Sequence, residues 1–270
     1  MPYQIDITTI ANIHFANEGD EIIIYGVKKV KVFVMREIQN KLSQSFSVIA
    51  LLTLSGGLQD AYSYFCRGGV FANAQTGNIV LLSATLVSGN YADSVKYLIS
   101  ITFFLLGVMT AKTLYFILEK SNRLFWKQIV LFVETAVLAC SAFIPQSLNL
   151  FANALVSFAC AMQVLTFDKI YGNSFASTMC IGNVVHLSDQ IVTAVVQRDK
   201  TALKTSGLYL AVVVTFAAGA SVGYLLQTTF NDHTILFSAA LTFTAAIIFF
   251  FAANRDKQNN VKKETTNENR

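Results

Sequence analysis

Charge is what this sequence has least of. Charged residues make up 13% of its 270 residues, whereas about 25% is typical of soluble proteins. Charge is densest toward the two ends, and the stretch from about 46 to 253 carries charged residues only sparsely. Because hydrophobic residues reach 54%, no polar surface can cover them in water. This excludes an ordinary soluble domain and predicts a chain embedded in the lipid bilayer.

Proline, cysteine and histidine are also scarce. The two prolines are Pro2 and Pro145, so almost nothing interrupts long helices. The four cysteines form no Cys-x-x-Cys pair, and the three histidines show no ligand spacing. We therefore expect no metal site and no cofactor.

Catalytic and nucleotide-binding motifs are missing as well. The sequence contains no Walker loop, His-Glu-x-x-His, Gly-x-Ser-x-Gly or dinucleotide fingerprint. A basic patch interleaved with aromatic residues is absent too, which argues against a nucleic-acid partner. The sequence predicts a protein that is not an enzyme.

Long apolar runs are what the sequence does have. A membrane-crossing helix needs about 20 such residues, and several stretches reach or approach this length. They are 46–66, 70–88, 97–118, 126–144, 148–166, 174–197, 207–227 and 234–253. We predict an all-α, polytopic transmembrane helix bundle with six to eight membrane segments.

The flanks of this bundle differ from it in composition. Residues 1–45 are predicted to be an N-terminal cytoplasmic extension and 254–270 a polar, disordered C-terminal tail. Within 1–45, the β-branched runs around Gly26 fit a small β-like cap. Residues 1–34 fit equally well an upstream extension, with Met35 as the true start.

Two parts of the bundle resemble one another. Residues 71–83 (FANAQTGNIVLLS) align with 175–188 (FASTMCIGNVVHLS) when one residue is inserted, and Gln59 then aligns with Gln163. The sequence predicts an internal repeat, with one copy at about 46–144 and the other at about 148–253. Such repeats are common in transporters.

Two topologies remain open. If every segment crosses the membrane, the two copies are parallel, and the basic loop with Lys120 and Lys127 lies outside. If 46–88 and the 174–197 region with its preceding segment each make one net crossing through a broken helix, the copies are inverted. The basic loops then all lie inside, as the positive-inside rule requires. Charge favours the second arrangement and segment length the first.

Polar residues inside the apolar segments predict a binding site. A carboxylate at membrane depth, Asp60, costs several kcal/mol and normally faces a cavity or a partner. It can also be an interfacial carboxylate paired with Arg67. The expected site residues of both copies are Gln59, Asp60, Asn73, Gln75, Thr76, Gly77, Asn78, Gly182 and Asn183.

Three further groups are expected to support this site by titration: Glu134, His186 and Asp189. Glu134 lies inside an apolar segment, where it either pairs with Lys112 or stays protonated. The small-residue patterns Gly107-xxx-Ala111 and Gly219-xxx-Gly223 predict close helix packing, within the chain or in a homodimer.

A family resemblance follows from the run SGGLQDAYSYFCRGGVFANAQTGNIVLL. Its Gly57-Leu-Gln-Asp60-Ala61, Gly68-Gly69-Val-Phe71 and Thr76-Gly77-Asn78 elements, with FLLG at 104–107, resemble the YoaK-like family of uncharacterised bacterial multi-spanning membrane proteins. The resemblance covers about 36–253 and implies that 1–34 are additional. The second copy departs from the pattern, because Ile181-Gly182-Asn183 stands where a Thr-Gly-Thr-like element is expected.

Together these features predict a small-molecule or ion transporter, proton-coupled in one version, in the cytoplasmic membrane. Both termini are expected on the cytoplasmic side, with the lipid bilayer and an unidentified solute as partners. The alternative is a membrane assembly partner or sensor that transports nothing.

Overall fold

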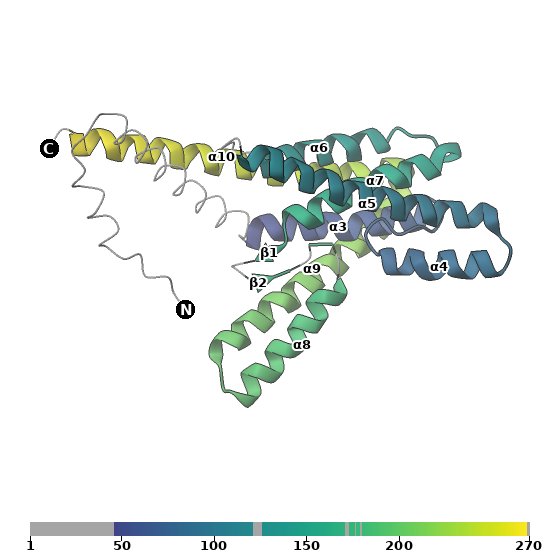
Figure 1. Cartoon of the computed structure of the whole chain (residues 1–270), viewed down its shortest axis with the longest axis horizontal. Helices are drawn as coiled ribbons and strands as arrows, with labels where there is room; N and C mark the ends of the chain where they lie inside the picture. The colour runs from purple at the N-terminus through teal and green to yellow at the C-terminus, as the bar shows by residue number, and fades with distance from the viewer. Residues whose placement is uncertain (1–45, 121–125, 171–172, 176, 179, 269–270) are drawn as a thin grey trace.

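The structure is a computed structural model that describes residues 46–120, 126–170, 173–175, 177–178 and 180–268. Almost all of this part is helical (Figure 1). The predicted extension at 1–45, with its alternatives for 1–34, lies outside the described residues.

The first half of the chain forms four helices. They are α3 (Phe46–Phe65), α4 (Gln75–Val87), α5 (Tyr91–Lys120) and α6 (Trp126–Ser141). In Figure 1, α3 and α4 run in the same direction, left to right, and α5 returns beside them. With 13 residues, α4 is only about 20 Å long, too short to cross a bilayer core of about 30 Å alone.

The second half follows the same order. After the short helix η1 (Gln146–Leu148) come α7 (Asn149–Thr166), strands β1 (Lys169–Ile170) and β2 (Asn173–Ser174), α8 (Cys180–Val196), α9 (Lys200–Phe230), η2 (Asn231–Thr234) and α10 (Ile235–Glu268). The antiparallel β1–β2 pair was not anticipated from the sequence. In Figure 1, α8 and the start of α9 diverge from the other helices as a hairpin.

Three pairs of helix contacts correspond between the two halves. Helix α3 packs against α9, as α7 packs against α5. Likewise α4 packs against α5 as α8 does against α9, and α3 packs against α10 as α7 does against α6.

Close backbone contacts at two glycines fix these pairings. A Cβ atom added at Gly219 would collide with the carbonyl oxygen of Leu54 on α3, and one added at Gly107 would collide with that of Phe158 on α7. Gly223 packs against Ala61 and Leu58 in the same way. The predicted small-residue faces are therefore used inside the chain, which removes the sequence argument for a homodimer.

The exterior is apolar and the interior holds the polar groups. Exposed side chains include Val80, Ile181 and Leu225, whereas Gln59, Glu134 and Asn73 are fully buried. A soluble protein has the opposite distribution. Three helical stretches, Tyr91–Leu118, Gln146–Thr166 and Lys200–Phe251, are long and apolar enough to cross a membrane by length and composition.

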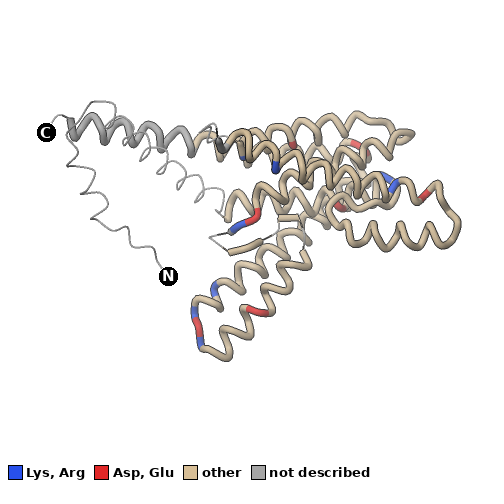
Figure 2. The backbone as a smooth tube through the Cα atoms, in the orientation of Figure 1, with Lys and Arg blue, Asp and Glu red and all other residues tan. Residues whose placement is uncertain are grey.

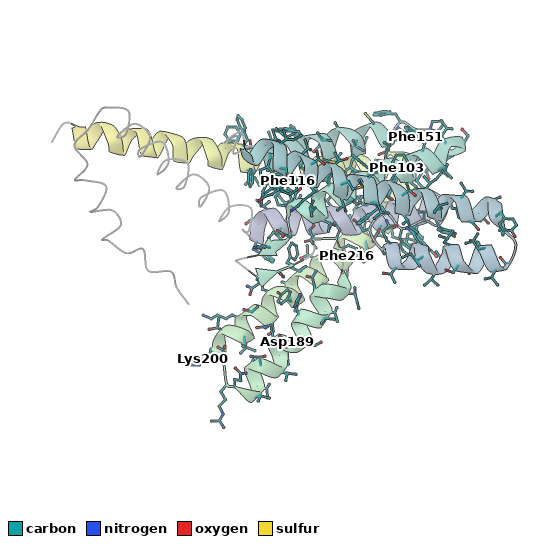
Figure 3. All side chains as sticks on the ribbon, in the orientation of Figure 1. Phe103, Phe116, Phe151, Asp189, Lys200 and Phe216 are labelled. Carbon is teal, nitrogen blue, oxygen red and sulfur yellow. The ribbon has the colours of Figure 1, made fainter. Side chains whose placement is uncertain are left out.

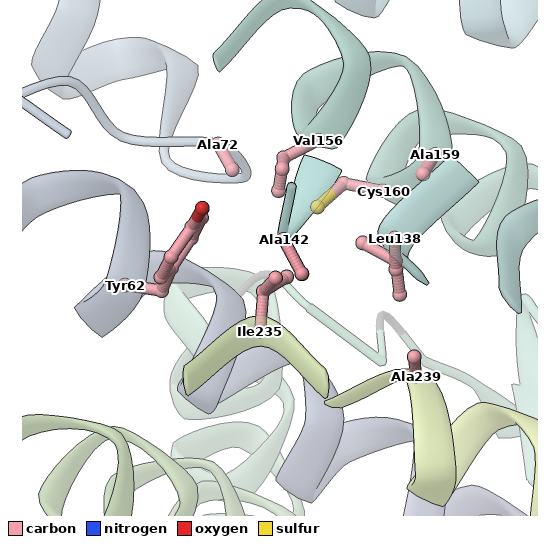
Figure 4. Close-up of a cluster of buried hydrophobic side chains, with 9 residues drawn as sticks. All are labelled: Tyr62, Ala72, Leu138, Ala142, Val156, Ala159, Cys160, Ile235 and Ala239. Carbon is pink, nitrogen blue, oxygen red and sulfur yellow. The ribbon is translucent and has the colours of Figure 1, made fainter. Parts of the chain in front are cut away.

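An apolar cluster joins the two halves around α3 and α7. It contains Tyr62, Ala72, Leu138, Ala142, Val156, Ala159, Cys160, Ile235 and Ala239 (Figure 4). Because Ala72 belongs to it, the segment that follows α3 is packed into the bundle rather than lying over its surface.

The predicted disordered tail is wrong for most of its length. Helix α10 continues from the membrane region to Glu268. Residues 254–268 contain neither proline nor glycine, and extending an existing helix costs little once it has formed.

Candidate functional site

The chain turns back into the bundle after α3. Helix α3 ends at Phe65, and Gly68 and Gly69 adopt φ values of 85° and 76°, which favour glycine. Asn73 then donates a side-chain hydrogen bond to the carbonyl oxygen of Gly56 (3.2 Å). Since Gly56 lies roughly 13 Å before the end of α3, α4 begins deep inside the bundle. We call residues 66–74 the first break.

Asp60 lies where the first break re-enters the bundle. Its carboxylate accepts a hydrogen bond from the backbone N–H of Asn73 (2.8 Å), just before α4 begins. A helix N-terminus favours a negative charge. Asp60 is buried, with 8% of its surface exposed. The alternative of an interfacial Asp60 paired with Arg67 is wrong.

Arg67 has other partners, and sequence reasoning missed its role. It is buried, donates to Tyr62 Oη (2.6 Å), Asn149 Oδ1 (3.0 Å) and the Ser141 carbonyl (3.1 Å), and lies 3.8 Å from the Asp232 carboxylate. Arg67 therefore ties the first break to α6, α7 and η2. The sequence did offer a signal for this role, because Arg67 stands directly before Gly68-Gly69 between two apolar segments.

Asn78 and Gln75 hold the first break in place. Asn78 accepts from the backbone N–H of Phe71 (3.0 Å) and donates to its carbonyl oxygen (2.7 Å), to Gln75 Oε1 (2.8 Å) and to Ser100 Oγ (3.2 Å). Gln75 donates to the carbonyl of Ala72 (2.8 Å), and Gly77 packs against the Phe71 ring. These residues position the break and have little capacity left for a ligand.

A second break, residues 167–179, approaches the same place from the other half. Gln163 near the end of α7 donates to Ser177 Oγ (3.0 Å) and to the Leu52 carbonyl of α3 (3.2 Å). A Cβ atom at Gly56 would lie 2.7 Å from Thr178 Cγ2. Both breaks therefore meet α3 at Gly56, and α8 begins two residues after Thr178.

Several buried oxygen atoms at this junction lack a partner among the described residues. They are Thr53 Oγ1, Asn73 Oδ1, Gln163 Oε1 and Thr178 Oγ1. All four side chains are at most 1% exposed. A buried polar atom without a hydrogen bond costs about 1–3 kcal/mol, so four of them at one junction indicate a place where a ligand completes the structure. We call Thr53, Asp60, Asn73, Gln163 and Thr178 the junction site.

Sequence reasoning missed Thr53 and Thr178 and used Gln163 only to align the repeat. A signal existed on α3, because the spacing of Thr53, Gly56 and Asp60 places them on one helix face. Nothing local in the sequence places Thr178 beside them.

A second polar cluster adjoins the junction site. Gln59 donates to Ser55 Oγ (3.0 Å), Ser238 Oγ (3.0 Å) and Glu134 Oε1 (3.4 Å), and it accepts from the Cys160 thiol. Glu134 is fully buried, and its Oε2 has no hydrogen-bond partner among the described residues. The expected pairing of Glu134 with Lys112 does not occur, since the Lys112 ammonium lies over the Tyr115 ring (4.9 Å).

The remaining predicted residues do not belong to the junction site. Thr76 is exposed, and His186 and Asp189 are exposed on α8, where His186 stacks on Tyr209. Figure 3 shows Asp189 on the diverging α8–α9 hairpin. Gly182 has open space around it and Asn183 is buried on the same helix. Over the described residues, no group of three or more His, Cys, Asp or Glu side chains could hold a metal ion.

These features define an integral membrane protein: a helical bundle with an apolar exterior, interrupted helices and polar groups inside. The family described as "Protein of unknown function (DUF1275)" matches residues 48–248, and the chain belongs to this family.

The "UPF0700 transmembrane protein YoaK" of Bacillus subtilis (strain 168) is 23% identical over 209 residues, which cover 73% of this chain and 90% of that protein. No solved structure matches the chain. The resemblance inferred from the sequence motifs is confirmed.

Proposed function

We propose that this protein is a transporter that moves a small solute or ion across the cytoplasmic membrane, with its binding site at the junction of the two breaks. One observation carries the proposal. Two helix interruptions, one from each half, meet at Gly56 and leave buried polar atoms without partners. Several transporters bind their substrates at interrupted helices near the membrane midplane.

The matching helix contacts of the two halves support a duplicated unit. The contacts of α3 with α9 and of α7 with α5 are related, and each is closed by a glycine against a carbonyl, Gly219 on Leu54 and Gly107 on Phe158. In Figure 1, α3 and α4 both run from left to right, α7 runs from right to left, and α8 continues leftward while slanting away from the bundle. On this reading each pair makes one net crossing. The protein then has six net crossings in two inverted units.

The distribution of charge supports cytoplasmic termini. Basic residues gather at the bundle end where α3 begins and at the tip of the α8–α9 hairpin (Figure 2). This end includes Lys127 at the start of α6 and Lys169 after α7, and the hairpin tip carries Arg198 and Lys200. Under the positive-inside rule it faces the cytoplasm.

A ligand screen with matched aspartate variants tests the proposal. The thermal midpoint of purified full-length protein is measured against a panel of metabolites and ions, for wild type, Asp60→Asn and Asp189→Asn. A ligand at 100 times its dissociation constant adds about 2.7 kcal/mol of stability. We expect a stabilising ligand whose effect is lost in Asp60→Asn and kept in Asp189→Asn, which makes the same chemical change on the exposed face of α8.

Uptake of that ligand into proteoliposomes then separates transport from binding alone. Uptake by wild type and by Asp189→Asn, with none by Asp60→Asn, supports the proposal. Equal uptake by all three proteins rules out the junction site as the transport site. A folded wild type that no ligand stabilises, but that copurifies with a stoichiometric partner, favours an assembly role instead.

A further inference from the structure

The junction site is built from oxygen atoms. Asp60 contributes a carboxylate, Thr53 and Thr178 contribute hydroxyls, and Asn73 and Gln163 contribute amide oxygens. Four of the five side chains have an oxygen without a hydrogen-bond partner among the described residues. Oxygen ligands of this mixed carboxylate, amide and hydroxyl type suit hard cations.

Shared neighbours bring these oxygens together. Asn73 hydrogen-bonds to the carbonyl of Gly56, and Thr178 packs on the Cα side of the same residue. Asp60 lies one turn beyond Gly56 on α3 and accepts from the backbone of Asn73, whereas Thr53 lies roughly 10 Å before Asp60 along the helix and is too far away to share an ion with it. Gln163 reaches this region through Ser177, the residue before Thr178. The five side chains come from α3, α7 and both breaks.

The hydrogen bonds of Asn73 and Gln163 use their amide nitrogens and leave their amide oxygens free to accept. The amide nitrogen of Asn73 donates to Gly56, and that of Gln163 donates to Ser177 and Leu52, so each side chain turns its oxygen away from these bonds. Free acceptors beside a carboxylate repel an anion and attract a cation.

Charge balance limits the cation to a single positive charge. Asp60 is the one carboxylate of the junction site, and the titratable groups facing it from neighbouring helices are the thiols of Cys160 on α7 and Cys180 at the start of α8. Glu134 on α6 also lies near Cys160 and accepts a hydrogen bond from Gln59. A monovalent cation neutralises Asp60, whereas a divalent cation leaves a net charge inside the membrane, which is costly.

Close packing favours a small ion. A Cβ atom at Gly56 would lie only 2.7 Å from Thr178 Cγ2, so the second break cannot move closer to α3. Thr53, Asn73 and Gln163 are fully buried. We propose that the junction site binds one sodium ion, held by Asp60, Asn73, Gln163 and Thr178.

This assignment rests on the proposed transport function, because it makes sodium the coupling ion or the cargo at the same site. Sodium bound beside Asp60 satisfies the unpaired oxygens of Asn73 in the first break and Thr178 in the second. Binding therefore ties the two halves of the protein together at Gly56.

Thermal unfolding of the purified full-length protein tests the assignment. Wild type is measured in NaCl, KCl and N-methyl-D-glucamine chloride at constant ionic strength, which removes general salt effects. We expect a saturable rise of the midpoint with Na⁺ that neither other cation produces. The same series is measured for Thr178→Val, Asp60→Asn and the surface control Asp189→Asn.

Thr178→Val keeps the volume of the side chain and removes one oxygen ligand, so it preserves the fold even if Asp60→Asn does not. We expect about a tenfold higher half-saturating Na⁺ concentration for Thr178→Val, since a hydrogen-bonding contact to a charged group contributes about this factor. Asp60→Asn should lose the response, and Asp189→Asn should keep it.

Equal effects of Na⁺ and K⁺ on wild type overturn the assignment. So does a Na⁺ response that Thr178→Val and Asp60→Asn leave unchanged, because the ion then binds elsewhere. If Na⁺ has no effect but a solute still stabilises the protein through Asp60, the sodium site is wrong and the transport proposal stands. If Na⁺ binds through Asp60 and Thr178 but no solute or ion moves across proteoliposomes, the sodium site stands and the transport proposal is wrong.

Discussion

The two breaks have similar backbone geometry and different chemistry. Each follows a bundle helix, re-enters beside Gly56 and starts a short helix. The first break carries Asp60 beside it, whereas the repeat alignment that pairs Gln59 with Gln163 puts Val164 at the corresponding place in α7. The two halves of the bundle therefore share their helix packing, but only the first half has a buried carboxylate at this place. This is expected, because a second buried charge would cost several kcal/mol.

The two breaks are also held in place by different polar contacts. Arg67 anchors the first break to three other elements, and Asn78 clamps its backbone. The second break is held by the β1–β2 pair and by Tyr209, whose hydroxyl donates to the Ser174 carbonyl (2.6 Å). The following substitutions test whether the two halves are equivalent in packing and unequal in polar fastening.

The largest effect is expected at the two glycine contacts. Gly219→Ala and Gly107→Ala each place a methyl group against a backbone carbonyl, Leu54 and Phe158 respectively, and neither backbone can move without separating two helices. We expect each to lower the free energy of unfolding by more than about 3 kcal/mol, seen as loss of folded protein in detergent. Gly207→Ala, which has open space on the same helix as Gly219, is the control. A mild effect at only one of the two glycines would contradict equivalent packing.

The next largest effect is the difference in stability loss when the polar contacts of the first break and of the second break are removed. Arg67→Met leaves Asn149 Oδ1 and the Ser141 carbonyl without their donor and takes away the cation beside Asp232, which should cost about 3–5 kcal/mol. Tyr209→Phe removes one hydrogen bond from the second break and should cost about 1 kcal/mol. The two thermal midpoints measure the difference. Lys96→Met, at a surface ion pair with Asp93 (3.2 Å), is the charge control. Similar losses for Arg67→Met and Tyr209→Phe would disprove unequal fastening.

Asn78→Ala should follow in size. It removes the side chain that pairs with both the N–H and the carbonyl of Phe71, so the first break loosens at a cost of about 1–3 kcal/mol. Because the break carries Asn73, Na⁺ stabilisation should weaken together with the thermal midpoint. Thr76→Ala, an exposed position two residues earlier, should change stability by no more than about 0.5 kcal/mol. An unchanged thermal midpoint for Asn78→Ala would show that the Asn78 side chain does not stabilise the first break.

The smallest expected effect is at the two aligned glycines, Gly77 and Gly182, where substitution by alanine should change the thermal stability in opposite directions. Gly77→Ala brings a methyl group within 2.9 Å of the Phe71 ring, so we expect a lower thermal midpoint. Gly182→Ala meets open space inside α8 and should raise stability by up to about 1 kcal/mol, since alanine favours helix over glycine. If both changes have the same sign, the first break is no more tightly packed than the second.

Much of the architecture could be predicted, because lipid imposes simple requirements on a chain. The apolar runs located each of the helices α3 to α10 and gave both ends of α3, α6 and α7 to within three residues, and the internal similarity paired Gln59 with Gln163, which lie in corresponding helices. The C-terminal helix beyond 253 was missed because polar composition was read as disorder, although nothing in 254–268 ends a helix.

The site was predicted only in part. Asp60 and Asn73 of the junction site, and Gln59 of the adjoining polar cluster, were singled out because polar groups at membrane depth are costly and therefore informative. Asn78 and Gln75 were assigned to ligand binding for the same reason, yet they hydrogen-bond to the backbone of the first break. A sequence shows that a buried polar group needs a partner, and it does not show whether that partner is backbone or ligand.

By itself, the sequence determined that this protein is a membrane-embedded helix bundle with a carboxylate in its interior, because burial in lipid is decided by local composition. Only the tertiary structure decided that Thr178 and Asn73, 105 positions apart in the chain, both reach Gly56. Contacts between distant segments depend on how helices pack and where they break, and these follow from close approach at residues such as Gly219 rather than from any local pattern.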